Sequence, residues 1–157
     1  MAQHKTLVAY ESKQGASKET AEILAKTLQS KFGLDVDLVN LKKEDVADLA
    51  QYGNVVVGAG VRGGRIYGNA LKLLKSDLGG KRVAFFTSSS WGGTPGSYEN
   101  AKGRFVVKTL AKYPEVNFVG SEAFGGRIRY FGKLMLDNTN PAKVEAWAEE
   151  LGKKFTE

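Results

Sequence analysis

Two short segments of the chain are apolar almost throughout, and they restrict its fold more than any other feature. Val55–Val57 holds only valine, and Arg82–Thr87 places Val-Ala-Phe-Phe between polar ends. Uninterrupted apolar strands are typical of parallel sheets covered by helices on both faces, whereas strands with one solvated face alternate apolar and polar residues. Asp35–Val39 begins with such alternation and Val116–Phe124 mixes both kinds. We therefore expect these two segments at the edges of a sheet, and Thr6–Tyr10 inside it.

Helical patterns separate these strands. The predicted helices are Lys18–Phe32, a weak helix between Glu44 and Tyr52, Ala70–Leu78, Tyr98–Tyr113, and a last helix that Asn140 caps, with Pro141 at its first position and Trp147 in its buried stripe. Parallel strands need crossover connections, and these connections are right-handed. The alternation therefore predicts an α/β three-layer sandwich, with a five-stranded parallel sheet of order 2-1-3-4-5 and helices on both faces. At this length we expect residues 1–157 to form one domain.

In such a sheet, ligands bind beyond the carboxyl ends of the strands, at the switch point between the first strand and the third. The loop Ser12–Ser17 follows the first strand and leads into a helix. Its free amides and hydroxyls and the positive end of the helix dipole favour a phosphate, and Gly15 permits close approach of the backbone. The alternative is that Ser17 only caps the helix and the loop is a turn.

Other phosphate chemistry is less compatible with the loops. The first loop has neither the Walker pattern nor the dinucleotide fingerprint, which argues against nucleotide hydrolysis. A phosphorelay receiver shares the strand order but needs an aspartate after the third strand. Gly58-Ala59-Gly60 stands at that place, so the receiver class is disfavoured.

Two further loops are rich in glycine. Gly58–Gly68 carries Arg62 and Arg65, and Ser88–Ser97 carries Trp91. Glycines permit positive φ and close approach to a flat ligand, and a tryptophan can stack on an aromatic ring. The alternatives are a flexible connection, arginines paired with surface carboxylates, and a tryptophan in ordinary packing. A phosphate loop followed by two such loops indicates a site for a flavin mononucleotide.

Composition narrows the chemistry further. The chain has no cysteine, which excludes thiolate nucleophiles and iron–sulfur ligation, and its single His4 gives no basis for histidine catalysis. We expect no metal and no catalytic side chain, so a cofactor must supply any redox chemistry. The net charge of +6 suggests an anionic partner, but no nucleic-acid motif is present, so we expect no nucleic acid and leave contact with a membrane surface open. The absence of a transmembrane run or a secretory signal predicts a cytoplasmic protein.

The loops also resemble a known family. The pattern Ser12-x-Gln14-Gly15-x-Ser17 resembles the [ST]-x-T-G-x-T phosphate loop of flavodoxins, with glutamine in place of the middle threonine. Three other segments resemble flavodoxin-domain proteins related to menaquinone-dependent protoporphyrinogen dehydrogenase. They are Gly58–Arg65, which looks like G-x-x-I-R-x-G-R, Gly80–Phe86 and Phe124–Ile128. The similarity covers most of the chain, although Arg129–Asn140 before the last helix is short. The resemblance implies a flavodoxin-like fold, noncovalent FMN, and transfer of electrons from a substrate such as a porphyrinogen to a quinone.

The expected FMN contacts come from all three loops. The predicted cofactor-binding residues are Ser12, Gln14, Gly15, Ala16, Ser17, Gly60, Val61, Arg62, Gly63, Gly64, Ser89, Ser90, Trp91, Gly92 and Gly93. Arg62 and Arg65 are expected near the ring edge or at an anionic substrate. Three functions stay open: an FMN oxidoreductase acting on a porphyrinogen or quinone, an electron carrier that docks redox proteins, and a flavin-free interaction domain. Because carrier flavodoxins are typically acidic, the basic charge favours the enzyme, or else a carrier with an unusual acidic partner.

Overall fold

The main sheet has the predicted topology. The structure, a computed structural model, describes residues 5–46 and 48–157. Within these residues the parallel strands are β1 (Lys5–Glu11), β2 (Val36–Asn40), β3 (Tyr52–Arg62), β5 (Arg82–Ser88) and β6 (Phe118–Phe124). Their order is β2-β1-β3-β5-β6, which confirms the predicted 2-1-3-4-5 arrangement. A short strand that the sequence did not predict, β4 (Arg65–Ile66), pairs antiparallel with the end of β3.

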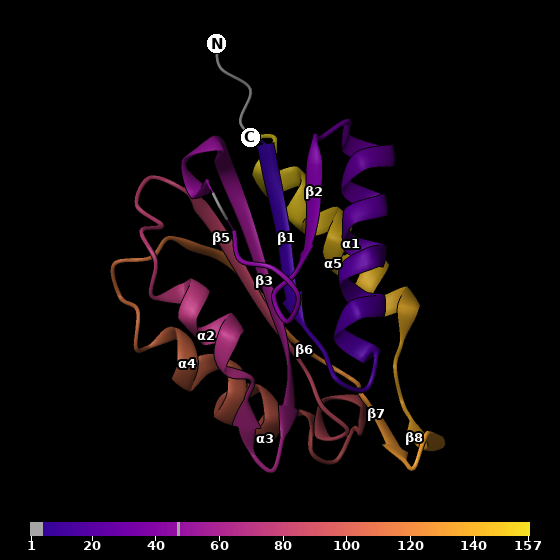
Figure 1. Ribbon diagram of the computed structural model, residues 1–157. Helices are drawn as coiled ribbons and strands as arrows, with labels where there is room; N and C mark the ends of the chain where they lie inside the picture. The colour runs from indigo at the N-terminus through magenta and orange to yellow at the C-terminus, as the bar shows by residue number, and fades with distance from the viewer. Residues whose placement is uncertain (1–4, 47) are drawn as a thin grey trace.

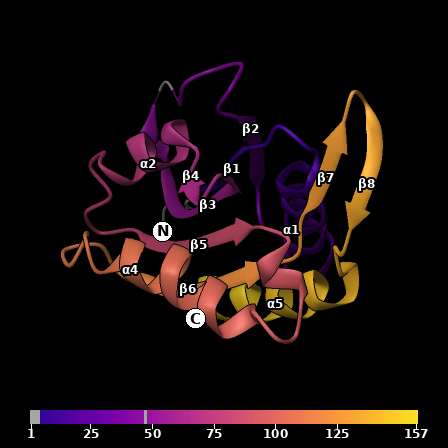
Figure 2. The same ribbon diagram turned by 90° about the horizontal axis from the view of Figure 1, so that it is seen from below.

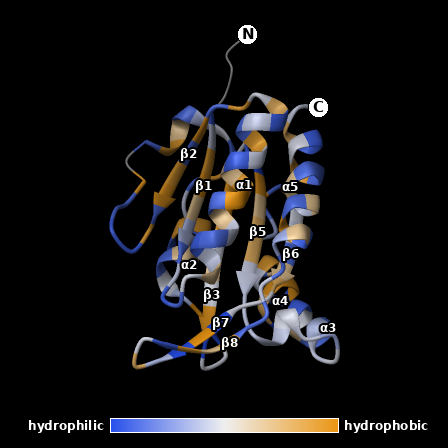
Figure 3. Ribbon diagram, turned by 90° about the vertical axis from the view of Figure 1, so that its right-hand side faces the viewer, coloured by the Kyte–Doolittle hydropathy of each residue, from blue (hydrophilic) through white to orange (hydrophobic). Residues whose placement is uncertain are grey.

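Helices cover both faces of the sheet (Figure 1). The helices α1 (Ala16–Phe32) and α5 (Pro141–Phe155) lie on one face, and α2 (Gly68–Leu74), α3 (Tyr98–Ala101), the π-helical segment η3 (Lys102–Val107) and α4 (Lys108–Leu110) lie on the other. Alternate residues of the central strands pack toward opposite faces: Val56 and Phe86 belong to the core under α1 and α5, whereas Val57 and Phe85 belong to the other core. Because both faces are covered, the middle of each central strand is apolar at successive positions, which Figure 3 shows in orange.

The last helix begins and packs as the sequence predicts. The Asn140 side chain accepts a hydrogen bond from the backbone N–H of Lys143 at 3.2 Å, and Pro141 occupies the first turn. Trp147 is 6% exposed and packs edge-to-face against Phe86 and Phe124. The prediction that this tryptophan belongs to the core is confirmed.

Three predicted helices differ from the structure. Between Glu44 and Tyr52 the described residues form only the 3₁₀ turn η1 (Leu49–Gln51), capped by Asp48, while residue 47 lies outside the described part of the chain. The helix expected over Ala70–Leu78 is α2, which begins at Gly68 and ends at Leu74. The helix expected over Tyr98–Tyr113 is divided by η3, in which wider π-type turns replace α-helical ones. Propensity alone does not distinguish these local hydrogen-bonding patterns.

The segment before α5 forms a hairpin that the sequence did not predict. The strands β7 (Arg127–Tyr130) and β8 (Lys133–Asp137) pair antiparallel outside the main sheet and project beside α1 (Figure 2). Phe131 and Gly132 form its two-residue turn with φ of 50° and 78°, the type that requires positive φ at both residues. Several apolar side chains of the hairpin are exposed, namely Ile128, Tyr130, Phe131, Leu134, Met135 and Leu136.

Candidate cofactor site

The loop after β1 leaves helix amides open at the carboxyl edge of the sheet. Gly15 stands before α1 with φ of 94°, and its N–H donates to the Ser12 hydroxyl at 3.0 Å. The first helical hydrogen bond runs from the Glu19 N–H to the Gly15 carbonyl. The amides of residues 16–18 precede this bond, and amides at that place have no carbonyl within the helix to donate to. Together these amides form one half of a candidate anion site.

The Ser17 side chain completes this half of the site. It is 1% exposed, and its hydroxyl has no hydrogen-bond partner among the described residues. The alternative that Ser17 caps the helix is wrong, because the cap is Gly15 and Ser17 lies inside the first turn. A buried hydroxyl without a partner costs about 1–3 kcal/mol, and a ligand that accepts its proton would remove this cost. This orphaned hydroxyl fits a phosphate.

A small cavity joins the loop after β1 to the ends of β3 and β5. It is lined by Ser12, Lys13, Gln14, Ala16, Ser17, Gly60, Tyr67, Ser88, Ser89, Gly126 and Arg127. Ser88 also has a buried hydroxyl without a partner among the described residues. The structure therefore brings the predicted phosphate loop together with Gly60 and Ser89, as expected of loops that meet at the switch point.

A second cavity lies between the two glycine-rich loops. It has a volume of about 420 Å³ and is lined by Val61, Gly63, Gly64, Ser89, Ser90, Trp91, Arg104 and Phe105. This volume falls within the usual range for small-molecule sites. Trp91 is 43% exposed, and its ring lies 6.1 Å from the Phe105 ring and 5.8 Å from the Arg104 guanidinium. The exposed indole leaves surface on which a planar ring can stack.

The glycines of the second loop have a defined geometric reason. Val61 pairs with Ile66 and Arg62 with Arg65 in the β3–β4 ladder. The two-residue turn between them, Gly63-Gly64, has φ of 59° and 77°, which only glycine adopts without strain. The two arginines thus lie directly opposite each other, both exposed, and neither forms an ion pair within the described residues. Two like charges without a carboxylate partner favour a nearby anion.

Two predicted contact residues lie elsewhere. A Cβ on Gly92 would stand 2.4 Å from the Phe124 carbonyl oxygen, and one on Gly93 would stand 2.5 Å from the Asn138 side chain. These two glycines line a separate cavity with Tyr98. They allow the loop after β5 to pack closely against the residues that follow β6, and their contact with FMN stays a prediction.

Several side chains outside the predicted set also line the two cavities, among them Tyr67, Arg104 and Arg127. Tyr67 lies against Gly60, and burial raises the pKa of its hydroxyl. Arg104 reaches the second cavity from η3, and Arg127 reaches the first cavity from β7. The Gly125-Gly126 pair after an edge strand is the one sequence signal that could have pointed to Arg127, because it too stands at the carboxyl edge.

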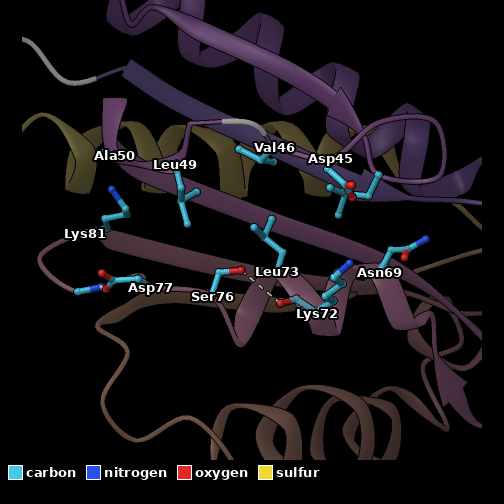
Figure 4. A pocket seen from close by; sticks show the side chains of 12 residues that line it. Asp45, Val46, Leu49, Ala50, Asn69, Lys72, Leu73, Ser76, Asp77 and Lys81 are labelled. Carbon is cyan, nitrogen blue, oxygen red and sulfur yellow. Dashed lines mark hydrogen bonds between the residues drawn. The ribbon is translucent and has the colours of Figure 1, made fainter.

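A larger cavity, of about 580 Å³, lies away from these loops (Figure 4). It runs along α2, between Leu73 and Lys72 on that helix and Asp45 and Leu49 of the β2–β3 crossover. Its charged side chains do not converge as the hydroxyls and amides of the loop after β1 do, so we place the cofactor site at the carboxyl edge.

The fold and this site define the class of protein. A three-layer sandwich with an anion site at the start of its first helix and a cavity for a planar ring beside it is a flavodoxin-type mononucleotide protein. A family model described as "Flavodoxin domain" matches residues 7–141, and the chain belongs to this family. FMN is the cofactor of this family, and the residues that line the two cavities are candidates to hold its phosphate and its ring.

Solved structures show the same fold. Flavodoxin 1 from Bacillus cereus, in its oxidised form, has 16% sequence identity with this chain and a TM-score of 0.65, with coverage of 97% of each chain. Flavodoxin 2 from Bacillus cereus has 22% identity and a TM-score of 0.67, with coverage of 96% of this chain and 99% of that one. Rubredoxin oxygen:oxidoreductase from Desulfovibrio gigas matches 98% of this chain with 37% of its own, at 14% identity and a TM-score of 0.69. A comparison with curated protein sequences found no match.

Proposed function

We propose that this chain is a single-domain FMN protein that transfers electrons between a small molecule and an acceptor. The observation that carries the proposal is the buried, unpartnered Ser17 hydroxyl at the open amides of α1. When bound, FMN supplies the redox chemistry through its ring, and the protein supplies position and exclusion of water. The loop of residues 12–17 would hold the phosphate, and the cavity that includes Trp91 would hold the ring.

The buried carboxylate at this edge of the sheet, that of Glu11, is already engaged within the protein. Glu11 is buried at the end of β1, but both of its carboxylate oxygens accept hydrogen bonds from Asn69. These bonds join β1 to the start of α2 and occupy the carboxylate. The chain's own contribution is therefore binding and electrostatics rather than proton transfer.

The charge at the ring cavity supports an anionic substrate or partner. Arg62 and Arg65 flank the Gly63-Gly64 turn, which lines the ring cavity, and Arg104 lines this cavity itself. A guanidinium binds carboxylates in a two-pronged geometry, which suits porphyrin propionates. Together with the resemblance in Gly58–Arg65, this favours an oxidoreductase with a porphyrinogen or quinone substrate. An electron carrier with an acidic partner protein is the second candidate, favoured by the likeness to flavodoxins.

The hairpin supports a partner that offers apolar surface. Phe131 at its tip is 94% exposed, and Arg129 and Lys133 lie beside it. Leu134 pairs with Arg129, so these two residues share one face of the ribbon. Ile128 precedes Arg129 in the strand and therefore lies on the other face, and both Leu134 and Ile128 are exposed. A lipid surface can surround both faces, whereas a rigid protein surface covers one. None of the helices in the described part of the chain is long and apolar enough to cross a membrane. We therefore propose contact with a membrane surface, from which a quinone could reach the site.

The cofactor proposal is tested by titration. Purified apoprotein is titrated with FMN while flavin fluorescence is followed, and riboflavin, which lacks the phosphate, is the matched ligand. FMN should bind much more tightly than riboflavin. Ser17→Glu should abolish this preference, because a carboxylate would stand where the phosphate binds. If wild-type protein binds neither flavin, the proposed function is wrong.

The choice between enzyme and carrier needs a turnover assay. FMN-loaded protein is mixed with a porphyrinogen and a soluble quinone, and the fluorescence of the porphyrin product is followed. Steady turnover at low protein concentration supports the oxidoreductase. Bound flavin that exchanges electrons with a redox protein but turns over neither small molecule supports the carrier.

A further inference from the structure

The first residue of the hairpin reaches the loop that begins α1. Arg127 lines the same cavity as Ser12 and Ser17, although more than 100 residues separate them in the sequence. Its Nη1 atom lies 3.5 Å from the place where a Cβ on Gly15 would stand, and its side chain is 13% exposed. The guanidinium therefore lies directly over the residue that opens the helix.

Two carboxylates bind this guanidinium through its Nε and Nη2 atoms. Its Nε donates to Asp137 at 2.9 Å, and its Nη2 donates to Glu19. Burial lowers the pKa of Arg127, but these two hydrogen bonds outweigh it and the pKa is raised overall. Nη1 has no hydrogen-bond acceptor among the described residues. The nitrogen nearest to Gly15 is thus the one that stays available for a ligand.

The hairpin is tied to the loop at a second point. The Arg129 N–H donates to the Gln14 side-chain oxygen at 3.1 Å, and the Arg129 Nε donates to the Gln14 carbonyl at 3.4 Å. These contacts and the bond from Arg127 to Asp137 are exposed, whereas the bond from Arg127 to Glu19 is partly buried. The hairpin is thus held to the start of α1 through two of its residues, Arg127 and Arg129.

We propose that Arg127 is a phosphate ligand, so that the anion site has two halves from distant parts of the chain. One half is the set of amides and the Ser17 hydroxyl at the start of α1, and the other is Nη1 of Arg127 on the hairpin. The inference rests on the proposed function, since it assigns a residue to the FMN phosphate. Glu19 and Asp137 also face the guanidinium, and Lys13 lines the same cavity. Glu19 is partly exposed and can turn to solvent when a dianion arrives.

The proposal has a structural consequence. A phosphate held by both halves joins the hairpin to α1, so cofactor binding should reduce the motion of the hairpin. The site then couples occupation by FMN to the position of the exposed apolar side chains at the tip. Riboflavin, which has no phosphate, cannot make this connection.

The test compares two ligands and two variants. Arg127→Gln should weaken FMN binding by about 10- to 100-fold, the usual effect of losing a hydrogen bond between charged groups, and leave riboflavin binding unchanged. Lys133→Gln removes a matched charge from the same hairpin and should change neither affinity. An unchanged ratio of FMN to riboflavin affinity in Arg127→Gln would overturn the proposal while leaving FMN binding itself intact.

A second measurement uses only the wild-type protein, in case the Arg127 variant does not fold. Hydrogen exchange of residues 127–137 is compared in the apoprotein, with FMN, and with riboflavin. FMN should slow exchange in the hairpin, and riboflavin should not. If FMN binds and protects the loop of residues 12–17 but not the hairpin, Arg127 does not hold the phosphate. If FMN does not bind at all, the proposed function fails instead.

Discussion

Replacing Ser17 with alanine should have opposite effects on the empty protein and on cofactor binding. In the apoprotein the hydroxyl is buried without a partner, at a cost of about 1–3 kcal/mol. Alanine removes this cost and has a helix propensity better than that of serine by a few tenths of a kcal/mol. The free energy of unfolding of the apoprotein should therefore stay equal or rise, by up to about 2 kcal/mol.

The same substitution should weaken FMN binding. A hydrogen bond to a charged group contributes about 1.5–3 kcal/mol, so its loss should raise the dissociation constant by about 10- to 100-fold. Apoprotein stability is measured by urea denaturation and affinity by flavin fluorescence. The matched control is Ser30→Ala near the other end of α1, where the hydroxyl donates to the Lys26 carbonyl at 2.8 Å and is exposed. This control should leave FMN affinity unchanged.

Two results would refute the reasoning. A loss of more than about 1 kcal/mol in the apoprotein would mean that the Ser17 hydroxyl has a partner inside the protein. An unchanged FMN affinity would mean that the hydroxyl does not face the phosphate. A residue that serves only the fold cannot raise apoprotein stability and lower ligand affinity in one substitution.

Three other predictions concern the sheet and the hairpin. Gly58→Ala should destabilise the protein by about 1–3 kcal/mol in urea denaturation, because the new Cβ would stand 1.9 Å from the Phe86 ring. In the control, Gly103→Ala, the Cβ meets no atom within 4 Å, so this variant should keep its stability. Equal effects of the two substitutions would contradict the packing described. Hydrogen bonds from Thr139 and Arg127 lower the pKa of Asp137 to about 2. The contribution of Asp137 to stability is therefore complete above about pH 4 and is lost as the pH falls toward 2. A carboxyl titration by NMR with a midpoint near 4 would show that these contacts are absent in solution. Phe131→Gly should keep or raise the melting temperature, because Phe131 has a positive φ and is almost fully exposed. The same substitution should reduce co-sedimentation of the protein with anionic vesicles. Unchanged vesicle binding would exclude the hairpin tip as the membrane contact.

The sheet was predictable because its signal is local. A strand such as Val55–Val57 must be apolar at each residue when helices cover both faces, so its sequence alone reports its place in the sheet. The same holds for α5, where Asn140 and Pro141 mark the start and Trp147 marks the buried face. The crossover between β2 and β3 was not predictable, because Asp48 caps a 3₁₀ turn with the residue types that also begin a helix.

The site was predictable in its location and only partly in its membership. The rule that ligands bind at the carboxyl edge selects the three loops from the sequence alone. It also selected Gly92 and Gly93, whose neighbours are Phe124 and Asn138 and whose contact with FMN stays a prediction. It could not find Arg104, because its place depends on how η3 turns toward Trp91.

By itself, the sequence determined a doubly covered parallel sheet and a glycine-bearing loop with free amides before the first helix. Both depend on short stretches of chain, whose periodicity and turn residues act within a few positions of one another. Only the tertiary structure showed that the Ser17 hydroxyl is buried without a partner and that Arg127 returns from the hairpin to lie over Gly15. The burial of Ser17 and the approach of Arg127 both depend on segments far apart in the sequence, more than 100 residues in the case of Arg127 and Gly15, and no local pattern records how packing brings such segments together.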